Sequence, residues 1–304
     1  MKKRLKSTTL GDKVFNVFNA LFMIVLVIVT LYPFINTIAV SFNDANDTVR
    51  GGIYLWPRIL TLYNYQSIFA DGTVYHAFFI SVSRTVISTV LNIFLTCMLA
   101  YALSRKEFVF RKSITTVFVL TMYFNAGLIP GYILIKDLHL YNSFLVYIIP
   151  SLISVFNLII IRTHIGSLPE SMIEAAKIDG AGEFRIFMQV VFPLCKPVLA
   201  VVGLLVAVGA WNSWFDTFLY APNNESLATL QYKMMQVLQS TMSTSTSAAS
   251  QYAKAGQGAS AASNTVTPVS MRAAITIVTA TPILLVYPFI QKYFVAMNIG
   301  SVKE

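Results

Sequence analysis

The side chains best suited to a specific chemical role form a short polar run, Glu174-Ala175-Ala176-Lys177-Ile178-Asp179-Gly180-Ala181, set between two long apolar segments. Met172, Ala175 and Ala176 share one face of a helix, because residues three and four apart are neighbours on its surface. The two alanines let the backbone of another protein approach that face closely. Glu174 lies beside it, and its carboxylate can pair with a partner's arginine. This run is therefore suited to recognition of another protein.

The flanking residues predict two short helices that position this run. Ser167 and Glu170 have the spacing of a capping box, so we expect a helix to start there and to continue through residues 171–178. Gly180 ends this helix, since glycine readily adopts the left-handed conformation found at helix ends. A second short helix is expected over residues 183–193.

The composition indicates an all-α integral membrane protein in contact with membrane lipid. Hydrophobic residues make up 56% of the 304 residues, charged residues only 12%, and the mean hydropathy is +0.67. Ordinary soluble domains contain about 25% charged residues. The net charge of +9 does not indicate nucleic-acid binding, because the basic residues lie in short segments beside apolar runs. Cys97 and Cys195 fall in or beside expected spans, so a disulfide framework is not supported.

Six apolar segments are long enough to cross a membrane, since a bilayer core of about 30 Å needs roughly 20 apolar residues per helix. The first is too long for the core of a cleavable signal peptide, so we expect it to be a retained helix. The third contains Gly127 and Pro130, which predict a kink or a break. The expected spans cover residues 14–40, 77–103, 114–135, 144–161, 198–220 and 273–293.

Lysine and arginine residues orient these six spans. Fifteen of the 22 lie in the N-terminal segment, the loops after the second and fourth spans, and the C-terminal tail. An excess of basic residues marks cytoplasmic segments, so both termini are expected in the cytoplasm. The expected parts are a cytoplasmic N-terminus (1–13), a first span (14–40), an extracellular loop (41–76), a core of five spans (77–293) with an inner loop (164–197) and an outer loop (221–269), and a cytoplasmic tail (294–304).

The two outer loops differ in composition. Residues 41–76 include Trp56 and Tyr65 and are expected to fold against the membrane surface. Residues 227–238 have apolar side chains at helical spacing. Residues 240–264 are almost entirely Ser, Ala, Thr, Gly and Gln, with too few large apolar groups to form a core, so we expect this stretch to be mobile.

A second group of residues suits the passage of a polar solute. Arg84 lies inside the second span, where charged residues are functional by default, although its long stem can also reach the membrane interface. Tryptophan rings stack on sugar rings, and amide or carboxylate groups bond sugar hydroxyls, whereas interfacial tryptophans are usually anchors. Both interpretations stay open for this pathway group, which comprises Arg84, Tyr123, Asn125, Trp211, Asn212, Trp214 and Asp216.

Several of these residues carry a resemblance to a known family. The run from Glu174 to Ala181, with Val190-Val191-Phe192-Pro193 and Pro197 after it, resembles the EAA loop of ABC importer permeases. About residues 10–304 resemble the carbohydrate branch of that family, and in it the second permease subunit of an oligosaccharide importer. The supporting motifs are Leu103-Ser104-Arg105, Trp211-Asn212-Ser213-Trp214-Phe215-Asp216 and Gln291-Lys292-Tyr293-Phe294. The run Phe124-Asn125-Ala126-Gly127-Leu128-Ile129-Pro130 is similar to the group that imports complex or pectin-type oligosaccharides.

The resemblance implies a type I ABC importer permease fold in the plasma membrane of a bacterium. It implies that the inner loop forms coupling helices seated in a cleft of a cytoplasmic ATPase dimer. There Glu174 pairs with an arginine, Ala175 and Ala176 fit the cleft, and Gly180 permits the turn. The other implied partners are a homologous second permease and a lipid-anchored or periplasmic binding protein that delivers an oligosaccharide. The full expected coupling set is Glu174, Ala175, Ala176, Asp179, Gly180 and Ala181.

Two other classes of function fit less well. Ion-coupled secondary transporters commonly have internal repeats and a carboxylate at the membrane midplane, but the expected spans contain no acidic residue except Asp216 near one end. An enzyme is not indicated, because the sequence has no H-E-x-x-H, G-x-S-x-G or G-x-x-x-x-G-K-[ST] motif. We expect magnesium and ATP to bind the partner ATPase and no cofactor to bind this chain. The three histidines have no metal-ligand spacing, so no metal site is expected.

Overall fold

The computed structural model of the chain describes residues 10–70, 72–240 and 266–300, with the backbone alone at residues 287 and 289–300. The described residues form helices and no β-strand, apart from one isolated bridge between Asn43 and Leu60, which confirms the all-α class. The chain divides into two compact units, Met1–Ala70 with Val237–Val278, and Asp71–Gln236 with Thr279–Glu304. Most of the Ser- and Ala-rich stretch and the end of the expected cytoplasmic tail lie outside the described residues.

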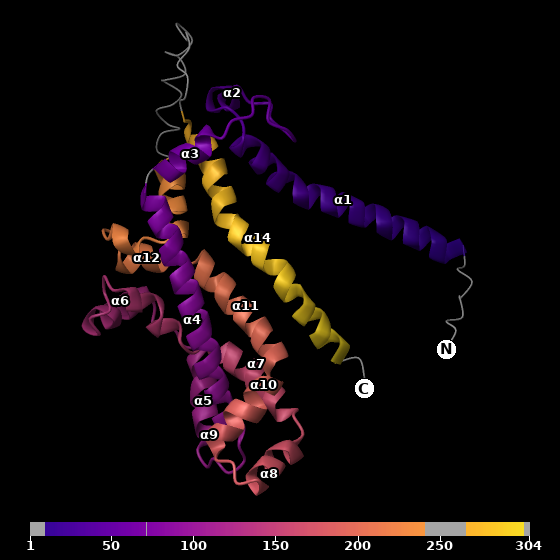
Figure 1. Cartoon of the computed structure of the whole chain (residues 1–304), viewed down its shortest axis with the longest axis vertical. Helices are drawn as coiled ribbons and strands as arrows, with labels where there is room; N and C mark the ends of the chain where they lie inside the picture. Colours follow the sequence, from indigo (N-terminus) through magenta and orange to yellow (C-terminus); the bar gives the residue numbers. More distant parts are fainter. Residues whose placement is uncertain (1–9, 71, 241–265, 301–304) are drawn as a thin grey trace. The chain divides into compact units, whose positions relative to one another are not determined.

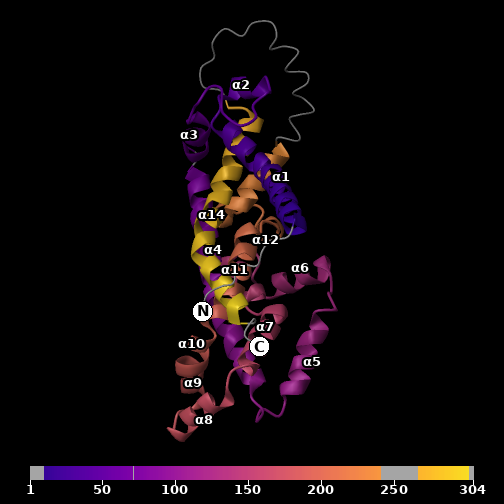
Figure 2. The same cartoon turned by 90° about the vertical axis from the view of Figure 1, so that its right-hand side faces the viewer.

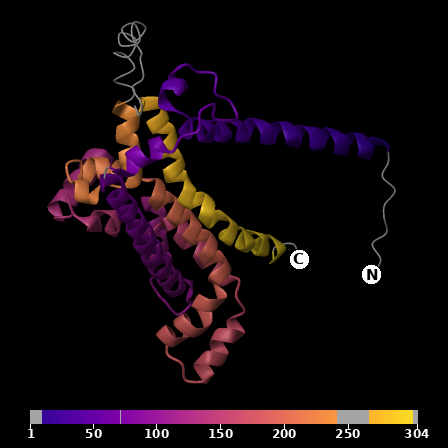
Figure 3. The same cartoon turned by 45° about the horizontal axis from the view of Figure 1, so that its top comes forward.

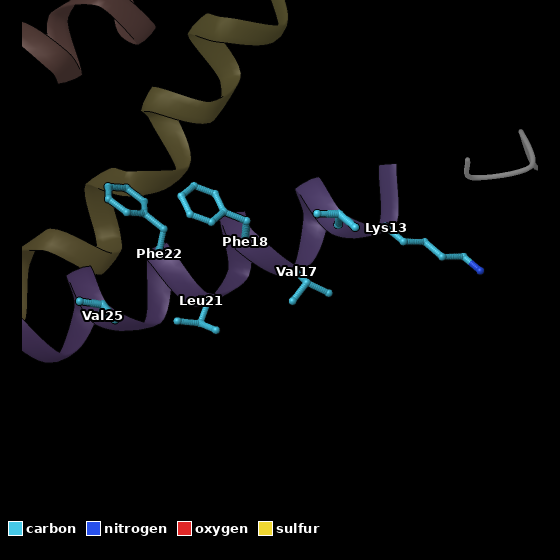
Figure 4. A pocket seen from close by; sticks show the side chains of 7 residues that line it. Lys13, Val17, Phe18, Leu21, Phe22 and Val25 are labelled. Atoms are coloured by element: carbon cyan, nitrogen blue, oxygen red, sulfur yellow. The ribbon is translucent and has the colours of Figure 1, made fainter. Parts of the chain in front are cut away.

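The first unit contains the long helix α1 (Leu10–Ser41) and two short helices, α2 (Ala45–Val49) and α3 (Tyr63–Ala70). The apolar side chains of α1 point to all sides of the helix. A shallow groove along it is lined by Val17, Phe18, Leu21, Phe22 and Val25 (Figure 4). A helix that is hydrophobic on all sides is typical of a membrane span.

The loop between α1 and α3 folds around the buried side chain of Asn43. Its amide oxygen accepts the backbone N–H groups of Arg58 (2.8 Å) and Ile59 (3.0 Å), and its amide nitrogen donates to Asp47 Oδ2 (3.0 Å) and Thr48 Oγ1 (3.1 Å). Arg58 also forms an ion pair with Asp47 (2.9 Å). The expected extracellular loop is therefore folded, while its contact with a membrane surface stays a prediction.

The second unit is built on α4 (Gly72–Ser104), against which α7 (Val155–Gly166) and α11 (Lys196–Asn212) pack (Figures 1 and 2). The close approach of α4 and α11 depends on Gly203, where an added Cβ would lie 2.7 Å from Ile93 Cδ1. Small residues allow such contacts between membrane helices. The buried core of this unit includes Cys97, Ala100, Leu158, Ile161, Ile186, Phe187, Val198 and Val202.

The remaining segments of the chain are mostly short. Residues 230–240 are also helical, which agrees with the apolar spacing over residues 227–238. The helix α14 (Pro268–Gly300) contributes to both units. The others are α5 (Arg111–Thr121), α6 (Leu128–Asp137), α8 (Glu170–Ile178), α9 (Glu183–Ile186), α10 (Phe192–Leu194), α12 (Phe215–Tyr220), the 3-10 turns Phe144–Tyr147, Ile149–Ser151 and Glu225–Leu227, and the π-helical turn Phe187–Val191.

Among the described residues, three helices are long and apolar enough to cross a membrane: α1, α4 and the Pro268–Val286 part of α14. Two pairs of helices, Phe144–Ser151 with Val155–Gly166 and Glu183–Leu194 with Lys196–Asn212, are bent by 47° and 79° and raise this number to five if each pair is one span.

The third expected span, residues 114–135, is not one helix. The predicted break is confirmed, because α5 ends at Thr121 and α6 begins at Leu128. The two pieces have 11 and 10 residues. At about 1.5 Å per residue, each piece covers about half of a bilayer core of roughly 30 Å, so neither can cross alone.

Candidate functional site

The polar run lies on α8 and in the turn that leads to α9, at one end of the second unit (Figures 1 and 3). Its turn has the predicted geometry, since Gly180 has a φ of +77°. The backbone N–H groups of Gly180 and Ala181 donate to the carbonyls of Lys177 and Ala176, both at 3.0 Å. This pair of bonds defines a Schellman motif. The expected helix end at Gly180 and the start of a second helix at Glu183 are confirmed.

The predicted capping box at the start of α8 is wrong. The Ser167 hydroxyl donates to the carbonyl of His164 at the end of α7 (2.7 Å), and no side chain caps α8. Glu170 accepts a hydrogen bond from Lys106 Nζ (2.7 Å), and its other carboxylate oxygen lies 4.0 Å from Arg105. The carboxylate that the box requires is thus held by the basic loop between α4 and α5.

The two sides of α8 differ in exposure. Ile173 is 6% exposed and anchors the helix, and Ala176 and Ala181 pack partly against the hydrophobic core. The Ile178 side chain is 86% exposed. Exposed apolar groups beside charged ones are typical of protein interaction sites. The outward residues include Met172, Glu174, Ala175, Ile178 and Asp179.

Lys177 ties α8 to its neighbours, which the sequence interpretation missed. Its ammonium donates to Glu107 in the α4–α5 loop (2.9 Å) and pairs with Glu183 on α9 (3.1 Å). The Tyr101 hydroxyl at the end of α4 donates to Glu183 (2.5 Å). Together with the pair between Glu170 and Lys106, these contacts form a clamp that holds both ends of α8 to the end of α4 and its following loop.

The clamp changes the acidity of its members. The hydrogen bond from Lys106 holds the pKa of Glu170 below its ordinary value, and that from Lys177 does the same for Glu107. Hydrogen bonds to Glu107 and Glu183 raise the pKa of Lys177. Glu107, Glu170 and Lys177 are therefore charged at neutral pH.

Arg84 and Asp216, both in the expected pathway group, meet in the second unit. Arg84 is 4% exposed and forms an ion pair with the Asp216 carboxylate. Its guanidinium also donates to the Ser213 carbonyl (3.1 Å) and lies 4.6 Å from the centre of the Tyr147 ring. Arg84 is thus held in an ion pair inside the second unit. Such a pair satisfies a charge that would otherwise be very unfavourable in an apolar interior.

The tryptophans and Asn212 of the pathway group lie in other surroundings. Trp211 is 5% exposed, and its indole N–H donates to the Thr279 carbonyl (3.0 Å), so it is a packing residue here. Asn212 accepts a hydrogen bond from Gln231 (3.1 Å). Trp214 contacts the rings of Phe215 and Phe218.

Tyr123 and Asn125 lie in the turn between α5 and α6. Tyr123 is 79% exposed, and the Asn125 side chain accepts the backbone N–H of Gly127 (2.8 Å). A cavity lies beside Arg84 and Asp216, and neither Tyr123 nor Asn125 lines it. A role for them in a pathway stays a prediction.

The cavity beside Arg84 also contains polar residues that the sequence interpretation missed. Ser88 and Asn92 follow Arg84 at four-residue intervals on α4, and that spacing within an apolar helix is a signal that could have found them. No sequence pattern marks Ser151, Ser154 and Asn157, which also line the cavity. In the part of the chain that the structure describes, no group of three or more His, Cys, Asp or Glu residues could hold a metal ion.

The chain is similar to known proteins over nearly its whole length, although no protein-family model matches it. It is 34% identical to the polygalacturonan/rhamnogalacturonan transport system permease protein YtcP of Bacillus subtilis, over 93% of this chain and 96% of that protein. It is 34% identical to protein LplC of the same organism, over 97% of each. It is 26% identical to the arabinooligosaccharides transport system permease protein AraQ of B. subtilis, over 95% and 96%.

The fold also has a close structural neighbour. A chain in the crystal structure of a bacterial ABC transporter involved in the import of the acidic polysaccharide alginate matches it with a TM-score of 0.83. The match covers 95% of this chain and 99% of that chain, at 25% sequence identity.

Proposed function

Because the chain belongs to the family of sugar permeases of ABC transporters, we propose that it is one of two permease subunits of an ATP-driven importer of oligosaccharides. The names of its relatives specify polygalacturonan, rhamnogalacturonan and arabinooligosaccharides, so complex or pectin-type oligosaccharides are the proposed substrates. The observation that carries the proposal is the 34% identity to a permease over 93% of this chain. The relatives belong to ABC systems, which favours this function over ion-coupled transport.

We propose six membrane crossings with both termini in the cytoplasm. The basic residues support this orientation, because most of them fall on one side of the six apolar segments. The third crossing is then the broken segment of α5 and α6. Residues 121–130 are exposed in this subunit, so the proposed second permease would have to cover their free backbone groups, because non-helical backbone at membrane depth is tolerated only where protein or a water-filled cavity surrounds it. The proposed location is the plasma membrane of a bacterium.

The proposed partners are a second permease, a cytoplasmic ATPase dimer that binds magnesium and ATP, and an extracellular binding protein that delivers the sugar. The exposed residues Glu174, Ala175 and Ile178 support α8 as the surface that docks on the ATPase. The clamp supports a rigid connection from α8 to α4, which carries Arg84 in its outer half. Movement of the docked α8 would then be transmitted to the polar cavity.

Purification of the tagged chain from its native membrane tests this proposal. Gentle extraction followed by mass spectrometry is expected to recover an ATPase, a second permease and a secreted binding protein. The reconstituted complex is expected to import oligosaccharides only with ATP. Recovery of this chain alone, under conditions that preserve known complexes, together with uptake that follows an ion gradient, would contradict it.

A further inference from the structure

The buried face of α4 carries polar side chains at regular intervals. Arg84, Ser88 and Asn92 are 4%, 2% and 2% exposed, and their four-residue spacing places them on one face of the helix. The Ser88 hydroxyl donates to the Arg84 carbonyl (2.7 Å), so it is satisfied within the helix. The other two residues carry larger polar groups that need partners outside α4.

These residues line one wall of a cavity of about 650 Å³ that lies entirely within the second unit. Its volume falls in the range of small-molecule sites, about 300–1,000 Å³. The facing walls combine polar groups with apolar surface. The polar groups include Tyr147, Ser151 and Asp216, and the apolar surface includes Phe156 and Leu205.

Two buried polar atoms of this wall have no hydrogen-bond partner among the described residues, Arg84 Nε and Asn92 Oδ1. The Asn92 amide nitrogen donates to the Ser151 carbonyl (2.7 Å), which orients the side chain and leaves Oδ1 as a free acceptor. One atom is thus a donor and the other an acceptor. Their residues are two helical turns apart, about 12 Å along the helix axis, a separation that suits a chain of sugar rings better than a single ion.

The charge of the cavity also favours a particular ligand. The Arg84 guanidinium is balanced by Asp216, so the walls offer hydrogen-bonding groups with little net charge. The apolar side chains can contact the C–H faces of a ring. We infer that this cavity is a saccharide-binding site within this subunit, in which Asn92 Oδ1 accepts a sugar hydroxyl, Arg84 Nε donates to a sugar oxygen, and Asn92 determines specificity. The inference rests on the proposed function and adds to it a site in this chain.

The test measures sugar binding to the complete permease–ATPase complex in nanodiscs without the binding protein, with trigalacturonate and arabinotriose as probes. Asn92→Leu removes the acceptor at similar volume. It is expected to lower the affinity about tenfold for whichever probe the wild-type complex binds, which is the effect of one lost hydrogen bond. Thr96→Val is the matched control. Thr96 lies one turn further on the same face, is fully buried with an unpartnered hydroxyl, and does not line the cavity. The affinity of the Thr96→Val complex for sugar should therefore change less than about twofold.

A second variant separates binding from a structural effect. Asn92→Asp keeps an acceptor but adds a negative charge, so it is expected to lower the affinity for trigalacturonate relative to arabinotriose. Three results would overturn the inference. Asn92→Asp could lower the affinity for both sugars equally, Asn92→Leu and Thr96→Val could lower the affinity equally, or Asn92→Leu could leave the affinity unchanged. A wild-type complex that binds neither probe but imports them when the binding protein is added would also overturn it. Failure of that complex to import any oligosaccharide would instead contradict the proposed function.

Discussion

The two members of the Arg84–Asp216 pair differ in their access to water. The Arg84 side chain is 5% exposed, whereas the Asp216 side chain is 23% exposed. Loss of Asp216 would leave a buried cation with only the Ser213 carbonyl and the Tyr147 ring beside it. Loss of Arg84 would leave an anion that water can still reach. The pair should therefore respond unequally to removal of its two partners.

Asp216→Asn is expected to destabilise the subunit by about 3 kcal/mol, the range found when one partner of a buried ion pair is removed. Arg84→Met is expected to have a smaller effect, because the remaining carboxylate is partly hydrated. Thermal unfolding of the purified complex measures both, and the double variant completes a cycle that isolates the pair. Equal losses of stability from the two single variants would contradict the expected asymmetry.

At the turn after α8, Gly180→Pro is expected to abolish transport while the subunit stays in the membrane. Proline fixes φ near −65°, which is incompatible with the observed φ of +77°. Glu174→Arg is expected to do the same by placing a cation opposite the proposed arginine of the ATPase. Sugar uptake and membrane content of the subunit are the measurements.

Gly180→Ala is the control for this turn. No atom lies within 4 Å of an added Cβ, so alanine adds only the strain of a positive φ, roughly 1–2 kcal/mol, and should retain part of the uptake. Normal uptake by both Gly180→Pro and Glu174→Arg would remove the proposed coupling role of α8.

At the scale of elements, the clamp joins α8 and α9 to the end of α4. Individual exposed ion pairs contribute little to stability, because water and salt screen them. A network with several members in defined geometry can still fix the orientation of a short helix. Ile173 is the one residue of α8 that is buried, so the clamp supplies orientation that packing alone does not.

Charge exchange tests the clamp. Glu107→Lys and Lys177→Glu are each expected to reduce the number of sugars imported per ATP hydrolysed, since each places like charges together. The double exchange should restore part of that ratio. Restoration is incomplete because Glu183 stays beside position 177. If the two single variants and the double variant all import the same number of sugars per ATP as the wild type, the clamp does not transmit movement.

The pH dependence of the clamp follows from its pKa shifts. The pKa of Glu107 is lowered from 4.5 and that of Lys177 is raised from 10.5. The stabilisation from Glu107 is full above pH 4.5 and is lost as the pH falls through the lowered pKa of this group. The stabilisation from Lys177 is full below pH 10.5 and is lost as the pH rises through the raised pKa of this group. The coupling ratio should thus be constant over the neutral range and fall in strong acid or strong base, while high salt should lower it at every pH.

The contact between α4 and α11 gives a stability prediction. Gly203→Ala should be tolerated, because the atom nearest to the added Cβ is the end of the flexible Ile93 side chain. Gly203→Leu should destabilise the complex by about 1–3 kcal/mol, the usual effect of overpacking. Melting temperatures of the two variants measure the difference, and equal values would contradict close packing at this site.

For the whole molecule, the proposed orientation can be tested by cysteine labelling. Cys97 and Cys195 are both free and fully buried, so the wild type should give little background. Trp56→Cys in the first outer loop is expected to react with a membrane-impermeant maleimide in intact cells stripped of their outer layers. Val109→Cys in the α4–α5 loop should react only after the membrane is opened. The two wild-type side chains are 81% and 85% exposed, so the reverse pattern would overturn the orientation and not reflect burial.

Features that depend on local structure could be predicted from the amino-acid sequence. It predicted the long apolar helices α1, α4 and α14, the break before Leu128, the helix end at Gly180 and the start of α9, because periodicity and glycine conformation act over a few residues. It also carried the family resemblance that the relatives confirm, since the EAA run is contiguous. It failed at Ser167, where a local pattern competed with the neighbouring basic loop.

Which polar groups meet depends on how the helices pack. Arg84 and Asp216 are 132 residues apart, and Tyr101 and Glu183 are 82 residues apart, so no short pattern joins them. The packing of α7 and α11 on α4 brings Asn92 to the Ser151 carbonyl and forms the cavity that Asn92 lines. Within a bilayer every buried polar group requires a partner, and that partner is supplied by another helix. The identity of the site therefore follows from helix packing, which spacing along one segment does not specify.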